Sequence, residues 1–381
     1  MRLLDRYLLR ELLVPLAYCL GGFLIFYVSF DLIFQINQFQ EKHLLFHEVV
    51  EYYVVTLPEI MADQVIPISL LLAALYALTN HSRHNELTAI RAAGVSLWRL
   101  ALPYLAVGIV CGAVIFTLNE FWVPNAAEVS KEIMDRHIHD SDPNKSAQIW
   151  DRHWTGRLEF HHDADQRHWM MSHYNRSTSE MITPHVTWET PDGASHWLSA
   201  GSAIFTNGQW RFYNAERWDR AADGFGRQTT NAFIDVPFSE PPASIRAEIK
   251  VASISATEAA KEGGKGPRLS IRELSSYLHW HPHLDRKNRW PIIMTQLQAR
   301  LAAPFTCVAV ILIALPFGAR SGRHNVFIGV AGSIFICFAY FIIQRISVGL
   351  GIAGYIHPIL AAWLPNILFG GAGIFLTSRV R

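Results

Sequence analysis

Histidine is the residue type in this sequence with the clearest capacity for chemistry, because its imidazole can bind a metal ion or move a proton near neutral pH. Most of the 18 histidines lie in the middle of the chain, including the pair His161-His162 and the alternating residues His279, His281 and His283. A zinc site needs ligands that converge from a fixed framework, and neither spacing provides one. We predict exposed polar side chains and no metal site, and a metal site remains the alternative.

Motifs for nucleotide binding and hydrolysis are absent from the sequence. The run Gly263-Gly264-Lys265-Gly266 lacks a serine or threonine after the lysine and a strand–helix pattern around it, so we expect a loop. Neither G-x-S-x-G nor H-E-x-x-H occurs. We therefore predict that this chain is not an enzyme and binds no cofactor.

Charged residues are scarce and unevenly placed along the chain. The 381 residues are 50% hydrophobic and 17% charged, whereas soluble domains average about 25% charged. Long apolar runs at both ends contain few charges, which is typical of a membrane protein. The four cysteines lie in these runs and are expected to be buried hydrophobic side chains. The net charge of +1 and the scattered basic residues predict no nucleic-acid partner.

Six segments are long and apolar enough to cross a bilayer, since a spanning helix needs about 20 mostly apolar residues. We expect them at about 12–36, 52–79, 97–123, 301–319, 326–350 and 358–378. The second is the weakest, because Glu59 and Asp63 interrupt its outer half. The first is too long for a cleaved signal peptide and is expected to be a spanning helix.

Arginines predict the orientation of these spans. They occur before the first span, between the second and third, between the fourth and fifth, and after the sixth. With six spans, all four segments fall on one side, and short loops rich in lysine and arginine face the cytoplasm. Both termini are therefore predicted to be cytoplasmic and the middle of the chain extracytoplasmic.

The middle region changes from a helical to an alternating pattern. We expect strands at about 150–160, 167–175, 185–190, 197–205, 209–218 and 229–236. Asn207-Gly208 is the strongest hairpin turn among them. So many short strands predict a sandwich or jelly roll, and Ser270 with Glu273 predicts a capping box that opens a short helix. We divide the chain into residues 1–129, 130–269 and 270–381.

A short amphipathic segment lies between the second and third predicted spans. Residues 83–99 read RHNELTAIRAAGVSLWR, with a polar start, apolar residues at Leu87 and Ile90, and small residues at 92–94. Such a helix can lie at the membrane surface and dock a soluble partner. A simple connector is the alternative.

Basic and aromatic residues near the predicted outer ends of the spans are candidate lipid contacts. The basic residues are Lys42, Arg136, Arg300 and Arg345. They can bind an anionic head group, although simple anchoring at the interface is the commoner role. Phenylalanines on one face of the first span, Phe26 and Phe30 among them, either line an acyl-chain cavity or pack against other helices.

The segment 86–99, ELTAIRAAGVSLWR, closely resembles the LptF/LptG permease family. Further similarity lies in LDRYLLREL at 4–12, NEFWVP at 119–124, and LAAP to ALPFG at 301–318. AAWLPN at 361–366 is more similar to LptG than to LptF. The resemblance covers both membrane thirds in order, whereas the middle is similar only in length and β character.

The resemblance implies a membrane protein with six transmembrane α-helices (3+3) and an inserted periplasmic β-jellyroll domain. Family members are permease subunits of an ABC-type transporter that extracts lipopolysaccharide from the bacterial inner membrane toward the outer membrane. The implied partners are an LptB-like ATPase dimer, which binds the ATP, a paralogous LptF-like permease, and an LptC-like protein that continues the periplasmic bridge. An alternative is a mechanotransmitting subunit that moves no lipid, or a membrane-anchored enzyme or sensor.

The resemblance also assigns roles to residues. It implies a cytoplasmic coupling helix at about 83–97 that contacts the ATPase, and the expected contact residues are Glu86, Leu87, Ile90, Arg91 and Gly94. Family chains of the LptG type have lysines late in the first span and early in the second, where this chain has Asp31-Leu32 and Pro58-Glu59. A carboxylate repels a phosphate, so either the lipid is less phosphorylated or Lys42, Arg136, Arg300 and Arg345 take that role. Phe26 and Phe30 are the expected contacts for acyl chains.

Overall fold

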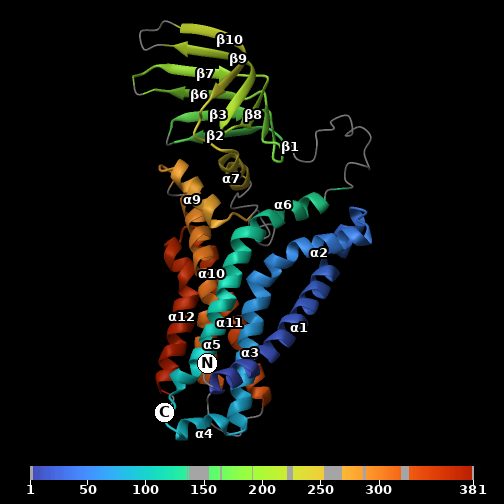
Figure 1. Ribbon diagram of the computed structural model, residues 1–381, viewed down its shortest axis with the longest axis vertical. Helices are drawn as coiled ribbons and strands as arrows, with labels where there is room; N and C mark the ends of the chain where they lie inside the picture. Colours follow the sequence, from blue (N-terminus) through green and yellow to red (C-terminus); the bar gives the residue numbers. More distant parts are fainter. Residues whose placement is uncertain are drawn as a thin grey trace. The chain divides into compact units, whose positions relative to one another are not determined.

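The computed structural model describes residues 3–134, 136, 154–163, 165–190, 192–220, 226–252, 268–285, 289–318 and 326–379. Its contacts divide the chain into two compact units (Figure 1). The helical unit contains residues 1–137 and 286–381, and the sheet unit contains residues 138–285. The sequence division assigns the helix after Ser270 to the C-terminal spans, but this helix lies in the sheet unit, where it packs on another helix of that unit.

Long helices build the helical unit. They are α1 (Leu3–Glu41), α2 (Phe46–Ile60), η1 (Met61–Val65), α3 (Ile66–Arg83), α4 (Glu86–Ala92), α5 (Leu97–Thr117), η2 (Leu118–Trp122), α6 (Val123–Met134), α10 (Arg289–Gly318), α11 (Val326–Ile352) and α12 (Pro358–Arg379). Within the described part of the chain, six continuous helical runs are long and apolar enough to cross a membrane. The prediction of six spans is therefore confirmed.

The second span is continuous although its outer half contains acidic residues. Helix α2 passes through the π-helical turn η1 into α3 without a break. About two thirds of its apolar window (67%) is buried inside the unit, and α3 contacts α1, α10 and α11. Hydropathy underestimates this span because the packing of neighbouring helices, and not lipid, surrounds most of it.

Helix α10 lies at the centre of the helical unit, in contact with α3, α5 and α12. Small residues allow this packing. A β-carbon at Gly112 of α5 would lie 2.5 Å from the carbonyl oxygen of Pro304, and one at Gly373 of α12 would overlap the backbone of Leu312. Glycine at these two positions lets the backbones approach closely, as in other membrane helix pairs.

An antiparallel sheet with two helices forms the described part of the sheet unit. The strands are β1 (Trp154–Thr155), β2 (Leu158–His162), β3 (Arg167–Met171), β4 (His173–Asn175), β5 (Glu180–Ile182), β6 (His185–Glu189), β7 (Ser195–Ser199), β8 (Ser202–Thr206), β9 (Gln209–Arg220) and β10 (Gly226–Val236). The helices are α7 (Pro242–Ala252) and α9 (Ile271–Trp280). The predicted β-rich insertion is therefore confirmed.

The ten strands join into one sheet in the order β1-β4-β5-β8-β9-β7-β6-β3-β2, with β10 also paired to β9. Strand β9 links the two halves, because one of its edges pairs first with β8 and then with β7. The sheet coils around its core. Strands β3 and β9 would be about 14 Å apart in a flat sheet, yet the rings of Trp169 and Trp210 lie 6.1 Å apart.

Local turn predictions hold where the structure describes them. Asn207 (φ 53°) and Gly208 (φ 79°) form the turn that pairs Thr206 with Gln209. The capping box opens α9, since Ser270 and Glu273 each accept a hydrogen bond from the other's backbone N–H. The expected loop at 263–266 and the first residues of the strand expected at 150–160 lie outside the described residues.

Three predicted strands are wrong in extent. The described part of 150–160 breaks into β1 and β2 around Gly156-Arg157, and the segments 167–175 and 197–205 break around Ser172 and around Ala200-Gly201. At Ser172 the chain changes partners: β3 pairs with β2 and β6, whereas β4 pairs with β1 and β5. At Ala200-Gly201 it changes again: β7 pairs with β6, whereas β8 pairs with β5. An alternating pattern continues across such a change of partner, so hydropathy does not reveal it.

Candidate functional site

Helix α4 occupies the short connection between the second and third spans. The chain turns into it through Asn85 (φ 57°) and out of it through Gly94 (φ 84°). The N–H of Gly94 donates to the carbonyl of Arg91 (2.9 Å), and that of Val95 donates to Ile90 (3.3 Å). This C-terminal turn needs a left-handed residue, which explains the glycine at position 94.

The carboxylate of Glu86 fixes the first turn of α4 to two other helices. It accepts hydrogen bonds from the hydroxyl of Tyr7 (3.0 Å) and from Nδ1 of His81 (2.7 Å). Partial burial raises the pKa of Glu86, but the hydrogen bonds from His81 and Tyr7 outweigh it and hold this pKa below its ordinary value. The expected contact residue Glu86 is thus engaged within its own chain.

A second contact ties the start of α5 to the same helix α1. The guanidinium of Arg99 lies 2.8 Å from the carboxylate of Asp5, while Leu8 and Leu12 are buried in the core. The segment 4–12 therefore contacts the first turn of α4 through Tyr7 and the first turn of α5 through Asp5. Sequence reasoning missed Asp5 and Tyr7 as partners, because they bond to residues 94 and 79 positions away.

The two faces of α4 differ. Leu87 is only 4% exposed in the core of the helical unit, and Ile90 packs against the same core. We therefore correct the expected partner contact at Leu87, since its apolar face anchors α4 to the bundle. The open side presents small residues: Thr88, Ala89, Ala92 and Gly94 are exposed, and Arg91 is half-buried.

The candidate lipid-binding cations have different surroundings. Arg136 forms ion pairs with Glu48 (3.0 Å) and Glu51 (3.1 Å), and hydrogen bonds to Glu51 and Glu48 raise its pKa. Nη1 of Arg300 donates to Oδ1 of Asn119 at 2.5 Å. Both guanidinium groups therefore already have partners within the chain. Lys42 is half-buried, whereas Arg345 on α11 is exposed.

Three exposed phenylalanines form a row along α1. The rings of Phe26 and Phe30 lie 5.8 Å apart, those of Phe30 and Phe34 lie 4.8 Å apart, and all three side chains are more than half exposed. A pocket of about 530 Å³ lies between the C-terminal part of α1 and the start of α2, lined by apolar residues such as Ile36 and Phe46. The α1 residues that line this pocket lie about half a turn around the helix from the phenylalanine row, so the pocket and the row are on opposite faces of α1.

A buried polar network locks the three C-terminal helices together. The Tyr340 hydroxyl bonds with Thr306 (2.9 Å) and donates to Asn366 (2.8 Å), whose side-chain amide donates to the carbonyl of Ala302 (2.9 Å). Asn366 ends the AAWLPN segment, so this segment contributes a helix-locking contact. The isolated polar residues Thr306 and Tyr340 within apolar runs were the signal for it in the sequence.

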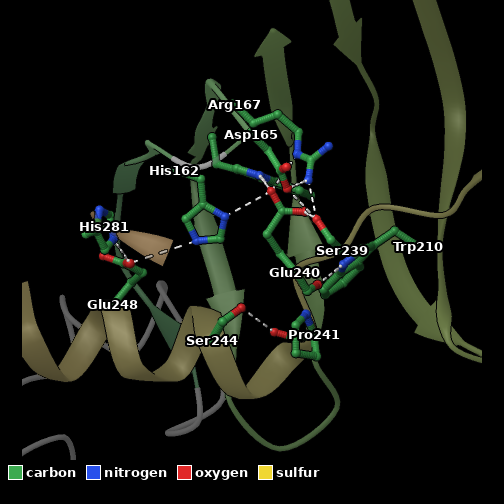
Figure 2. Close-up of polar contacts among 11 residues, drawn as sticks. His162, Asp165, Arg167, Trp210, Ser239, Glu240, Pro241, Ser244, Glu248 and His281 are labelled. Carbon is green, nitrogen blue, oxygen red and sulfur yellow. Dashed lines mark hydrogen bonds and ion pairs between the residues drawn. The ribbon is translucent and has the colours of Figure 1, made fainter. Parts of the chain in front are cut away.

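The sheet unit contains a buried polar cluster around Glu240 (Figure 2). One oxygen of Glu240 accepts from Nδ1 of His162 (3.0 Å), Nε of Arg167 (2.6 Å) and Nε1 of Trp169 (3.2 Å). Burial raises the pKa of Glu240, but hydrogen bonds from His162 and Arg167 outweigh it and bring the pKa to about 2. The cluster connects β2 and β3 to the segment that leads into α7.

The prediction of exposed histidines is wrong at two positions. His162 is 0% exposed because it lies on the covered face of β2, and His281 is 8% exposed because it packs against α7 at the end of α9. Their neighbours His161, His279 and His283 are exposed as expected. Spacing alone cannot separate the two groups, because alternate residues of one segment face different surroundings.

Comparison with protein families identifies the family of this chain. A family model described as "Lipopolysaccharide export system permease LptF/LptG" matches residues 6–379. The chain belongs to the LptF/LptG family. The match covers both units, so the LptF/LptG permease consists of the spanning helices, α4 and the inserted sheet. No curated protein matches the chain.

Membership of the LptF/LptG family gives the broad function. The protein is a multi-pass membrane permease of lipopolysaccharide export, and LptF/LptG proteins are permease subunits that are not themselves enzymes.

Proposed function

We propose that this LptF/LptG permease is a membrane subunit of an ABC-type transporter that extracts lipopolysaccharide from the inner membrane and passes it to a periplasmic bridge. The observation that supports this most directly is α4, a short helix tied by Glu86 to Tyr7 and His81 and flanked by the Asp5–Arg99 ion pair. A displacement of α4 is transmitted to α1, α3 and α5 through these contacts. That is the task of a coupling helix.

The exposed side of α4 is the docking surface for an LptB-like ATPase dimer, which binds and hydrolyses ATP. Thr88, Ala89 and Ala92 are small and exposed, so another protein surface can approach the helix backbone closely. Arg91 adds a cation at the edge of this surface. Leu87 and Ile90 face the bundle and convert pressure on α4 into movement of the helices behind it.

The arginine distribution supports a cytoplasmic position for α4. Helix α1 begins and α12 ends at the same end of the helical unit as α4 (Figure 1). Arg6 lies in α1, Arg91 in α4 and Arg379 in α12. Arg83 ends α3 and Arg99 lies in the first turn of α5, on the two sides of α4. Because short cytoplasmic segments are rich in arginine, we assign this end and both termini to the cytoplasm and the sheet unit to the periplasm, where an LptC-like protein receives the lipid.

The exposed aromatic row is the proposed contact for lipid acyl chains. Phe26, Phe30 and Phe34 present a continuous apolar surface. The pocket lined by Ile36 and Phe46 is a separate apolar site, because it lies on the opposite face of α1. Arg345 is our candidate for an anionic head group, because its side chain is exposed on α11 about 10 Å along the helix from Ile352. Arg136 and Arg300 contribute less, since carboxylate or amide groups already engage them.

We propose that this chain takes the LptG-like role and pairs with an LptF-like permease. The similarity of residues 361–366 supports this choice. Co-expression with separately tagged LptF-like and LptG-like proteins tests it, and selective recovery with the LptF-like protein is expected. Selective recovery with the LptG-like protein would reverse the assignment.

Capture of the ATPase tests the docking surface. The change Ala89→Trp places a bulky ring on the exposed side of α4 and is expected to reduce co-purification of the ATPase at least tenfold. Ala353→Trp is the matched control, an exposed alanine just beyond the end of α11, and should retain full capture. Equal capture by both variants would remove α4 from the interface.

Lipid contact needs a separate measurement, because a mechanotransmitting subunit would also capture an ATPase. A photoreactive amino acid at Phe30 is expected to crosslink to lipopolysaccharide in cells. The same probe at Tyr277, which is buried in the sheet unit, provides the background. Crosslinking at Phe30 no stronger than at Tyr277, together with normal lipopolysaccharide delivery after depletion of the chain, would favour the subunit that moves no lipid.

A further inference from the structure

Three potential metal ligands converge inside the sheet unit from separate elements. His162 ends β2, Glu248 lies in α7, and His281 follows α9. Their ligand atoms all lie within 4.8 Å of one another, and each residue is at most 8% exposed. Figure 2 shows the imidazole of His162 directed toward Glu248, with His281 on the far side of that carboxylate. The fold therefore supplies the convergence that the sequence spacing does not.

One ligand atom in this group lacks a hydrogen-bond partner. Nε2 of His162 is buried and makes no hydrogen bond within the described part of the chain. It lies 4.0 Å from Oε1 of Glu248, which is beyond hydrogen-bond distance. Leaving a buried polar atom unsatisfied is unfavourable. A metal ion between His162 and Glu248 would satisfy this nitrogen.

A neighbouring carboxylate orients His162 as a ligand. Nδ1 of His162 donates to the carboxylate of Glu240 (3.0 Å), so Nε2 carries the available lone pair. Metal-binding histidines usually direct the second ring nitrogen to a carboxylate, as His162 does, which fixes the tautomer and the ring orientation. Nδ1 of His281 lies 3.8 Å from the carboxylate of Asp163, which is too far for a hydrogen bond.

Aromatic packing fixes the ring plane of His162. The Trp280 ring stacks on it at 4.9 Å between centroids, with an interplanar angle of 6°. The Tyr277 ring packs on His281 at 4.4 Å. Both histidines are therefore held before any ion arrives, which lowers the cost of forming a site.

We propose that His162, Glu248 and His281 bind a zinc ion that fastens α7 and the end of α9 to β2. Two imidazoles and a carboxylate are a known zinc donor set, with a water in the fourth position. Ligands of a tetrahedral zinc lie about 3.3 Å apart, so small side-chain rotations close the present spacing. The hydrogen bond from Nε2 of His281 to Glu248 (2.5 Å) is replaced by the ion, and its proton leaves to solvent.

Zinc content of the full-length permease tests the site. The protein is purified in detergent without a polyhistidine tag, stripped with a chelator, reloaded with zinc, desalted and measured by inductively coupled plasma mass spectrometry. Wild-type protein is expected to retain one zinc ion per chain. His162→Ala and His281→Ala should each retain at least tenfold less zinc per chain. The exposed neighbours provide matched controls, so His161→Ala and His283→Ala should bind like wild type.

Two results would overturn the proposal. The first is wild-type zinc content no higher than that of His162→Ala, which would leave a hydrogen-bonded cluster without an ion. The second is equal loss in the control variants, which would indicate nonspecific binding by surface histidines. If a histidine variant loses its folded circular dichroism spectrum, Glu248→Gln decides, because it keeps the side-chain shape. It should still weaken zinc binding at least tenfold, and unchanged binding would refute the site.

Discussion

Glu86 in the helical unit and Glu240 in the sheet unit both accept a hydrogen bond from Nδ1 of a buried histidine. The Glu86 side chain is 36% exposed, whereas that of Glu240 is 0% exposed. A carboxylate at the surface can exchange its partners for water, but a buried one cannot leave without stranding its donors. The same type of histidine–glutamate pair can therefore open and re-form at α4, whereas in the sheet unit it stays closed.

The largest expected effect comes from removing the buried carboxylate. Glu240→Ala leaves Nδ1 of His162, Nε of Arg167 and Nε1 of Trp169 without their acceptor and should destabilise the sheet unit by about 3–5 kcal/mol. Hydrogen exchange of the β2 and β3 amides in the full chain measures this loss. The control Glu216→Ala, on an exposed position of β9, should stay within about 0.5 kcal/mol of wild type. Similar effects in both variants would contradict the assigned role of Glu240.

A buried polar contact in the helical unit should give an intermediate effect. Tyr340→Phe removes the hydroxyl between Thr306 and Asn366 and should cost about 1–3 kcal/mol, because the remaining groups are buried. The thermal unfolding midpoint in detergent measures it, and Tyr355→Phe, at an exposed tyrosine, should leave the midpoint unchanged. This comparison tests whether burial, and not the type of unit, sets the cost.

A smaller effect is expected at Glu86. Glu86→Gln keeps the side-chain shape but weakens the hydrogen bonds from Tyr7 and His81, so the α4 amides should lose about 0.5–1.5 kcal/mol of protection. The amides of α10 should be unaffected. Hydrogen exchange resolved by peptide distinguishes the two. Equal loss of protection in α10 would show that Glu86 stabilises the whole helical unit and not α4 alone.

The smallest effect is a pH dependence confined to α4. Because the pKa of folded Glu86 is lowered, its contribution is fully present above the ordinary carboxyl pKa and is lost as the pH falls through the lower folded value. Protection of α4 should therefore be constant from pH 7 to about pH 5 and decrease below the ordinary glutamate pKa of about 4.3. Glu86→Gln should abolish this decrease. Persistence of the decrease in that variant would assign it to another group.

Local patterns were enough to predict much of this fold. The six spans follow from long apolar runs, the hairpin from Asn207-Gly208, and the start of α9 from Ser270 and Glu273. Each depends on residues that are close in sequence. The breaks near Ser172 and Ala200 escaped prediction because they are set by the choice of strand partner.

The sites were less predictable than the fold. The sequence indicates α4 and its glycine turn, but the contacts that hold α4 join Asp5 to Arg99 and Tyr7 to Glu86 across most of the N-terminal third. In the sheet unit, His162 meets Glu240 across 78 positions. No spacing rule links residues so far apart, and only the tertiary fold shows which of several histidines are buried.

The position of β9 between both halves of the sheet has a mechanical consequence. Its backbone is bonded to β10 along one edge and to β8 and β7 in turn along the other. A force that separates the halves must therefore break one of the ladders on β9 before either half can move independently. The two halves of the sheet are therefore coupled mechanically. Tension on β2 passes through β3, β6 and β7 to β9, and β9 carries it along its own backbone to β8.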